Sequence, residues 1–324
     1  YNTPFSNIFK KHLHIPNKPN ILYLSPSGNS GYANAAKSYI TTLIYNGYNV
    51  YHRTIRPENN FISEAQYDDQ DILLDVLNKK DISIEDIDII ILHSLPTFWK
   101  PLINQIPRKP GLKVYGLTVW ETNNIPNEFI EHFDCVDSIL VPSQFNHNVF
   151  NNFKKTHVLP HPIFHKSITI NNNTPEYNTE MYTLLNQHFI CNYTNNNDLI
   201  SCGNNIFIET HTSTPLQYFD NKYVFYTITT FELRKNIFKL IDTYTEFIKT
   251  HNYSNIILYI KATHNNNIID YLTYIKQQTI NSPIVFNFNN LNDTQLNTIH
   301  SKSNCFISLT HSEGVGLGSV HAAL

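Results

Sequence analysis

The sequence contains little cysteine, and the cysteines it has are not paired. Its 324 residues include 4 cysteines and no Cys-x-x-Cys motif: Cys135, Cys191, Cys202 and Cys305. Such sparse thiols are typical of a reducing compartment, so we expect free cysteines and a protein of the cytoplasm or another reducing compartment. A bridge between Cys191 and Cys202 stays open for the case of a secreted chain.

Long apolar runs and an excess of charge are also missing. The longest apolar runs, such as residues 88–93, have the length of a strand and fall far short of the about 20 residues that span a bilayer. A net charge of −3 and a pI near 6.6 provide no basic face for nucleic acid. We therefore expect no transmembrane segment and no nucleic-acid partner, while peripheral contact with a membrane surface stays open.

The two ends of the sequence lack familiar features. Tyr1 stands where an initiator methionine would, and no charged start followed by an apolar run indicates a signal peptide. Leu324 falls inside an expected helix, with no closing element after it. We expect a second domain that is truncated at its C-terminus.

Metal-binding patterns are absent as well. His157, His161 and His165 recur at four-residue spacing, but Pro160 and Pro162 exclude the helix that would align them. No Asp-x-Asp pair stands at the carboxyl end of an expected strand. We expect no metal and no resident cofactor.

What the sequence does contain is a regular alternation of strand and helix patterns. In the first half we expect helices at 33–45 and 64–80, and strands at 20–25, 48–53, 87–93, 113–119 and 138–141. In the second half we expect helices at 236–250, 267–278 and 294–301, and strands at 223–229, 255–262, 284–288 and 305–309. This alternation predicts an α/β fold with two Rossmann-like domains on parallel sheets.

The expected domains cover residues 1–165 and 223–324. Between them, the segment 166–222 is rich in asparagine and only weakly periodic. We expect it to be a surface insertion or linker that lies outside both sheets. A loop at the edge of the cleft that touches substrate stays open as an alternative.

The most informative stretch is 311–322, where a carboxylate and glycines follow a short apolar strand. Gly314 and Gly316 lack a Cβ, so the backbone can approach a ligand, and Glu313 can accept hydrogen bonds from sugar hydroxyls. The carboxyl end of such a strand favours an anionic or hydroxyl-rich ligand. A plain glycine-rich turn that opens a helix is the alternative.

Five further segments accompany this one in a fixed order. The six are Ser30-Gly31-Tyr32-Ala33, Thr118-Val119-Trp120-Glu121-Thr122, Val141-Pro142-Ser143-Gln144-Phe145-Asn146, Val158-Leu159-Pro160-His161-Pro162, Glu232-Leu233-Arg234-Lys235-Asn236 and Glu313-Gly314-Val315-Gly316-Leu317. Together they resemble the retaining glycosyltransferases of family four, over 20–160 and 223–324. The resemblance implies the GT-B fold, in which two Rossmann-like domains face each other across a cleft that binds a nucleotide sugar for glycan biosynthesis.

The resemblance also implies roles for single residues. Arg234 and Lys235 match the pair that holds the donor diphosphate, and physics supports this because both cations form charge-assisted hydrogen bonds with phosphate. A solvated helix start is the alternative. Ser30 and Gly31 match a loop that approaches the donor phosphate, although a tight turn would look the same. Glu121 matches the acceptor pocket, where it would orient or deprotonate a hydroxyl, or else cap the next segment.

One position departs from the family pattern. Glu313 is followed eight positions later by His321, where the family has a second glutamate that binds two ribose hydroxyls. Neutral histidine offers at most one acceptor nitrogen, so we expect donor binding to be weaker by about 1–3 kcal/mol. Gly314, Gly316 and Leu317 complete the expected donor site, with Glu121 and Glu313 as catalytic candidates.

We therefore expect a metal-independent, retaining glycosyltransferase of the hexosyltransferase type. Its partners would be a nucleotide sugar and a glycan or other hydroxyl acceptor. A catalytically inactive sugar- or nucleotide-binding module with the same fold is the alternative, which His321 and the truncated end favour. A GT-B epimerase or phosphorylase is a third interpretation.

Overall fold

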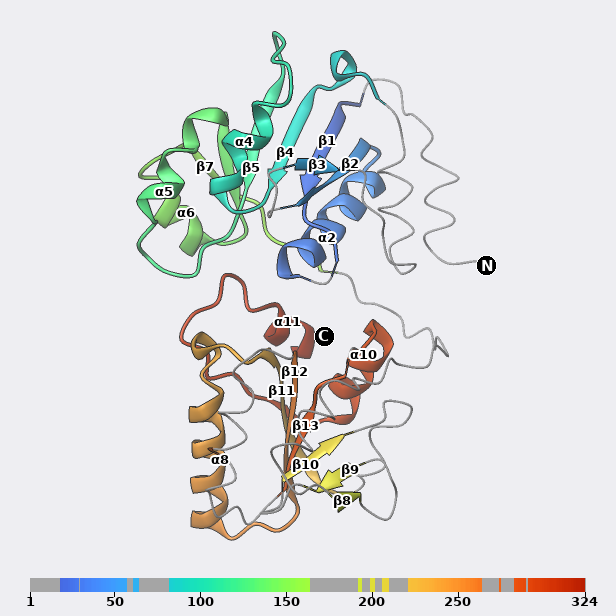
Figure 1. The fold of residues 1–324 in the computed structure, drawn as a ribbon, viewed down its shortest axis with the longest axis vertical. Coiled ribbons are helices and arrows are strands. Elements are labelled where there is room, and N and C mark those ends of the chain that lie inside the picture. The colour runs from blue at the N-terminus through green and yellow to red at the C-terminus, as the bar shows by residue number, and fades with distance from the viewer. Residues whose placement is uncertain are drawn as a thin grey trace, which may run out of the picture. The chain divides into compact units, whose positions relative to one another are not determined.

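The structure is a computed structural model that describes residues 18–28, 30–56, 61–63, 82–163, 192–193, 199–201, 206–209, 221–263, 274, 283–289 and 291–323. The chain divides into two compact units, Tyr1–Phe164 and His165–Leu324. Each unit is built on its own sheet, with helices on both faces (Figure 1). The helix expected at 64–80 lies outside the described residues, as does all but one residue of that expected at 267–278.

The sheet of the first unit has the strand order β3-β2-β1-β4-β5-β6-β7. Its strands are β1 (Asn20–Ser25), β2 (Asn49–Arg56), β3 (Phe61–Ser63), β4 (Ile89–His93), β5 (Lys113–Leu117), β6 (Ser138–Val141) and β7 (Thr156–Val158). All neighbours pair in parallel except β3, which runs antiparallel to β2. The order reverses between β1 and β4, which makes the carboxyl ends of these two strands a topological switch point.

Helices cover the two faces of this sheet unequally. The helices are α2 (Gly31–Tyr45), α4 (Trp99–Ile103), α5 (Asn127–Ile130) and α6 (Gln144–Phe150). One face packs against α2 through residues such as Tyr39 and Ile40. The other packs against the shorter helices through Trp99 and Phe150 (Figure 1). The alternation of β1 explains this, because Tyr23 belongs to the first core and Leu24 to the second.

The sheet of the second unit has the strand order β14-β11-β12-β13-β10-β9-β8. Its strands are β8 (Asn192–Tyr193), β9 (Leu199–Ser201), β10 (Ile206–Glu209), β11 (Tyr223–Thr230), β12 (Ile256–Thr263), β13 (Ile284–Asn287) and β14 (Cys305–Phe306). Its helices are α8 (Ile237–His251), α10 (Asp293–Lys302) and α11 (Leu317–Ala323). Ile241 of α8 packs on one face and Ile299 of α10 on the other. The order reverses between β11 and β14, so the loops after these strands meet.

The expectation that 166–222 lies outside both sheets is wrong. β10 pairs in parallel with β13, with Ile208 opposite Phe286, and β9 and β8 extend the sheet as antiparallel strands. These strands were missed because they are short and because β10 ends in a buried carboxylate, Glu209, instead of an apolar residue. Tyr259 and Asn287 satisfy that carboxylate through hydrogen bonds of 2.6 and 2.8 Å.

The last strand is also shorter than expected. β14 ends at Phe306, whereas the sequence predicts a strand over 305–309. Beyond it, Ile307 N–H still donates to the carbonyl of Tyr226 at 2.8 Å. The following residues leave the sheet because their partners lie in the loop after β11, which is the first feature of the candidate site.

Candidate functional site

The candidate site forms where the loops after β11 and β14 meet. The loop after β11 contains a single 3-10 turn, Leu233–Lys235, and ends at Asn236, which has a left-handed φ of 55°. Three hydrogen bonds tie the second loop to the first: His311 N–H and the Thr310 hydroxyl donate to the carbonyl of Arg234 at 2.9 and 3.1 Å, and the Asn236 amide donates to Leu309 at 3.1 Å. The backbone of both loops is therefore fixed before any ligand binds.

Three of the predicted site residues come together there, although they are far apart in the sequence. Lys235 Nζ pairs with Glu313 Oε1, and Arg234 lies 3.6 Å from Glu313 Oε2. Arg234 also donates to the carbonyl of Ser312 at 2.9 Å and pairs with Glu232 at 3.2 Å. Two cations thus hold the Glu313 carboxylate, and its acceptance of hydrogen bonds from sugar hydroxyls stays a prediction.

The ion cluster is partly shielded from water. The side chains of Lys235, Arg234 and Glu313 are 17%, 29% and 30% exposed. Coulomb attraction at such positions is stronger than on a fully exposed surface. The cations are still accessible to a competing anion from solution. The arrangement can therefore exchange a protein carboxylate for a ligand phosphate without moving the backbone.

The glycines of the second loop differ in what they require. Gly316 has a φ of +72°, a conformation that side chains rarely adopt. Gly318, in α11, lies against the Phe306 ring, so that a Cβ would come within 3.3 Å of its Cζ. Gly314 has no positive φ, and Leu317 is the first residue of α11. The turn at 314–317 thus depends on Gly316, and the prediction that these residues bind a donor stays a prediction.

His321 lies on α11 as an exposed side chain. It acts on His300, whose pKa is lowered first by burial and then by the neighbouring His321. His300 in turn is hydrogen-bonded to the Tyr226 hydroxyl at 2.8 Å. His321 lies eight residues after Glu313 in the chain, and its contact with a donor stays a prediction.

In the first unit, the predicted residues follow the carboxyl ends of β1 and β5. Ser30 caps α2 by accepting from the backbone N–H of Ala33 at 3.2 Å, and a Cβ at Gly31 would meet open space. Tyr32 connects this helix start to the end of β5, because its hydroxyl donates to the Val119 carbonyl at 3.2 Å. Burial raises the pKa of Tyr32, and the charge of Glu121 adds to this in a smaller way. Ser30, Gly31 and Glu121 therefore share one edge of the sheet.

Beside this edge lies a buried histidine cluster that the sequence did not reveal. His93 ends β4 and is hydrogen-bonded to the Tyr23 hydroxyl at 2.7 Å. His52 is hydrogen-bonded to Ser25 Oγ at 2.9 Å. Burial lowers the pKa of both histidines to about 3, so both are neutral at physiological pH. A polar residue that ends an apolar strand pattern, as in Ile89–His93, was the available signal.

A second missed group is a buried lysine in β12. Lys261 is 6% exposed, and its ammonium donates to the carbonyl of Ala262 at 3.2 Å. Burial lowers its pKa to about 8. No carboxylate within ion-pair distance of Lys261 is found in the described part of the chain.

Two further expectations concern cysteines and metals. Cys135 and Cys305 are free, whereas Cys191 and Cys202 lie outside the described residues. Within the described ranges no group of three or more His, Cys, Asp or Glu side chains is placed to hold a metal ion, and no helix is long and apolar enough to cross a membrane.

Comparisons with known proteins identify the fold. No protein-family model matches the chain, and no curated protein matches its sequence. Among solved structures, the chain is similar to a UDP-forming α,α-trehalose-phosphate synthase from Burkholderia xenovorans, with 10% identity, a TM-score of 0.52 and coverage of 94% of this chain and 81% of the other. A second similar structure is trehalose-6-phosphate from E. coli bound with UDP-2-fluoro glucose, with 9% identity and a TM-score of 0.53. That alignment covers 94% of this chain and 82% of the other.

A third similarity is partial. TarM of S. aureus, in complex with Fondaparinux, alpha-GlcNAc-glycerol and UDP, is 14% identical with a TM-score of 0.43, and the alignment covers 72% of this chain. The chain spans only 39% of the length of that structure. At such identities the comparisons speak to fold alone, and the trehalose-phosphate synthase likeness covers both units. The chain has the α/β architecture of the GT-B fold, with two Rossmann-like domains.

Proposed function

We propose that the protein is a glycosyltransferase that transfers a sugar from a nucleotide-sugar donor to a hydroxyl acceptor. The observation that carries the proposal is the cluster of Arg234, Lys235 and Glu313 at the switch point of the second sheet. Ligands of open α/β sheets bind at such points. Two cations beside a fixed backbone provide the charge that a diphosphate needs both in the bound donor and in the departing nucleotide.

In this proposal the diphosphate displaces the Glu313 carboxylate from Lys235 and Arg234. The freed carboxylate then accepts hydrogen bonds from hydroxyls of the transferred sugar, the role that the family resemblance implies. Binding and catalysis thereby become coupled, because the donor itself releases the group that recognises its sugar. Glu121, at the edge of the first sheet, is proposed to orient the acceptor hydroxyl.

The finer assignments are part of the same proposal. Retention of the anomeric configuration and independence from metal rest on the resemblance to family four. UDP-sugars are the donors to test first, because two of the solved structures with the same fold are described by UDP or a UDP-sugar. Metal independence has a direct test, which is transfer in the presence of excess chelator, and the anomer of the product can be read by NMR.

Lys235→Ala tests the donor site directly. We expect it to weaken UDP binding by about 1.5–3 kcal/mol, as for a lost charge-assisted hydrogen bond, with little change in folding. Lys239→Ala is the matched control, because Lys239 is exposed on α8 one turn further on. Titration calorimetry measures both. Equal UDP affinities for wild type and Lys235→Ala would remove this residue from the site.

A catalytically inactive binding module is the second candidate. It is favoured by His321, which stands where the family has its second ribose-binding carboxylate. The two functions differ in one measurement, because a module binds UDP-sugars without consuming them. Donor hydrolysis or transfer that is lost in Lys235→Ala and kept in Lys239→Ala supports the transferase. UDP-sugar binding without hydrolysis or transfer, for every acceptor tested, supports the binding module.

A further inference from the structure

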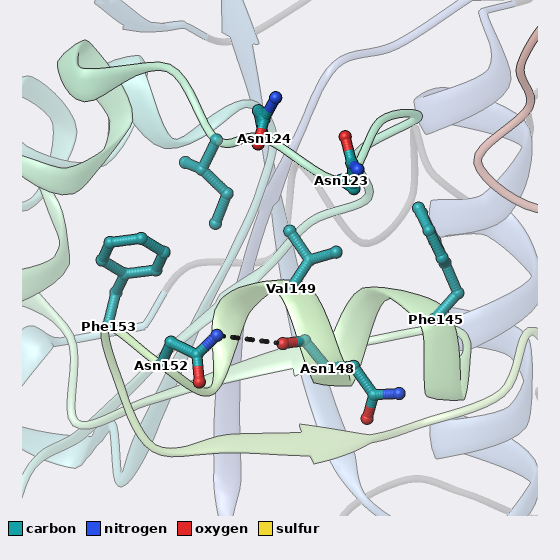
Figure 2. A pocket seen from close by; sticks show the side chains of 8 residues that line it. Asn123, Asn124, Phe145, Asn148, Val149, Asn152 and Phe153 are labelled. Carbon is teal, nitrogen blue, oxygen red and sulfur yellow. Dashed lines mark hydrogen bonds between the residues drawn. The ribbon is translucent and has the colours of Figure 1, made fainter.

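A hollow of about 450 Å³ lies within the first unit, outside the residues proposed for donor and acceptor chemistry. One wall is the segment after β5 and the other is the outer side of α6 and the turn after it (Figure 2). Eight residues line it: Asn123, Asn124, Ile125, Phe145, Asn148, Val149, Asn152 and Phe153. Neither the sequence motifs nor the structural similarities assign it a ligand.

Aromatic rings stand at the two ends of this hollow. Phe145 and Phe153 are 46% and 48% exposed, and Val149 lies between them on the same side of the helix (Figure 2). Phe145 lies near the start of α6 and Phe153 in the turn after its end, so the length of this seven-residue helix, roughly 10 Å, separates them and exceeds a single sugar ring. An exposed ring alone needs no explanation, but here two spaced rings border one hollow, and such a pair suits an extended ligand with apolar faces.

The polar lining is made only of amides. Asn123 and Asn124 line the hollow from the segment after β5, and Asn148 and Asn152 line it from α6 and the turn after it (Figure 2). Each amide can both donate and accept, which matches hydroxyl groups that do the same. None of the eight side chains carries a charge, so the hollow offers no counter-charge to phosphate, sulfate or carboxylate.

The two walls are held in place before a ligand arrives. Asn146, which is fully buried, accepts from the Trp120 N–H at 3.0 Å and donates to the Trp120 carbonyl at 2.8 Å. The Trp120 indole donates to the carbonyl of Asn124 at 2.7 Å, and the Thr122 hydroxyl donates to it at 3.1 Å. Such preorganisation lowers the entropic cost of binding.

We propose that this hollow binds a neutral oligosaccharide of at least two sugar units, whose ring faces lie on Phe145 and Phe153 and whose hydroxyls bond to the asparagine amides. Binding itself does not depend on sugar transfer. The added assignment, that the bound chain is the acceptor glycan, rests on the proposed function and on the short link from Glu121 to Asn123.

The test is titration calorimetry of the full chain with three neutral probes, maltoheptaose, laminarihexaose and chitopentaose, and with hexagalacturonate as the anionic probe. We expect at least one neutral probe to bind with Kd of roughly 0.1–1 mM, as for weak specific sites. Phe145→Ala and Phe153→Ala should each weaken it at least fivefold, and Phe153→Tyr should retain it. Tyr253→Ala, a change of an equally exposed ring in the second unit, is the control.

UDP affinity, measured on the same variants, separates this inference from the proposed function. It should stay unchanged in Phe145→Ala and Phe153→Ala whether or not the protein transfers sugar. The inference is overturned if no neutral probe binds, if Phe145→Ala and Phe153→Ala bind the neutral probe as well as wild type does, or if hexagalacturonate binds equally tightly. Loss of UDP binding in Lys235→Ala would leave these outcomes untouched.

Discussion

The two units share a doubly wound sheet but differ in the chemistry of their carboxyl edges. In the first unit the buried polar groups are neutral, with His52 hydrogen-bonded to Ser25 and His93 to Tyr23. In the second unit the edge carries the ion cluster around Glu313. The same topology thus supports one edge suited to hydroxyl groups and one suited to an anion.

The difference follows from how each edge is shielded. Complete burial favours the uncharged form of a titratable group, and this is why the pKa values of His52 and His93 fall to about 3. Partial exposure leaves the ion pairs among Arg234, Lys235 and Glu313 open to competition from a ligand. The fold therefore places the two edges, and the degree of burial distinguishes the neutral edge from the charged one.

The largest expected difference between the units is the loss of folding stability at acidic pH, which should be greater in the first unit. A histidine whose folded pKa is depressed contributes stability that is present above its unfolded pKa of about 6.5 and is lost as pH falls toward 3. At pH 5 each of His52 and His93 should cost about 2 kcal/mol, or about 4 kcal/mol together. Hydrogen exchange at pH 8, 6 and 5, resolved by peptide, measures the loss in each unit.

His93→Gln is the control for this experiment, because it removes one titrating group and should reduce the acid loss in the first unit by about 2 kcal/mol. His161 of the same unit, whose pKa burial lowers to about 4, adds to the loss that remains. His300 in the second unit also has a lowered pKa, but it is only partly buried and should contribute less. Equal acid losses in the two units, or no effect of His93→Gln, would show that the histidines are not the cause.

Substitution of Glu313 tests the role of the ion cluster in the second unit. Glu313→Gln should reduce turnover about 100-fold, or about 3 kcal/mol, if the carboxylate recognises the transferred sugar. UDP binding should stay equal or tighten, because Lys235 and Arg234 lose a competing anion. Glu232→Gln is the matched control, since Glu232 contacts Arg234 at 3.2 Å but lies outside the glycine loop. A fall in UDP affinity for Glu313→Gln would contradict the proposed exchange.

The comparison also explains what the sequence could predict. Apolar strands such as β4 and amphipathic helices such as α8 follow from periodicity, because their neighbours bury one face or both. The short strands β8, β9 and β10 do not, since β10 carries Glu209 and depends on Tyr259 and Asn287 from distant strands. These strands form because of contacts with residues far away in the sequence, and the local sequence pattern carries no information about such contacts.

The candidate site shows the same limit. The family resemblance selected Arg234, Lys235 and Glu313, and the strand order of the second sheet brings them together. The resemblance did not predict the ion pairing of Glu313, because that pairing depends on hydrogen bonds that join two loops far apart in the sequence. The histidine cluster and the asparagine-lined hollow were missed for a similar reason, since their members come from several elements.

The buried lysine of the second unit offers a test in which the substitution should stabilise the fold. Because burial depresses the folded pKa of Lys261 to about 8, its charge destabilises the fold below that pH, and the penalty disappears as pH rises toward 10.5. Lys261→Met should stabilise the second unit by about 2 kcal/mol at pH 7. Thermal unfolding from pH 7 to 10 should show this gain shrinking. A gain that stays constant with pH would mean that packing, and not charge, is responsible.

The smallest expected effect is at His321, where the second unit departs from the family pattern. His321→Glu restores the carboxylate that the family uses for ribose, so we expect UDP to bind more tightly by about 1 kcal/mol, a gain of roughly fivefold. His321→Gln is the control, because it removes the imidazole without adding a charge. Since His321 is exposed and acts on His300, both variants should also raise the pKa of His300, which NMR titration can follow. If His321→Glu leaves UDP affinity unchanged while the His300 pKa moves, this position on α11 does not contact the ribose, and the charged edge of the second unit ends at Glu313.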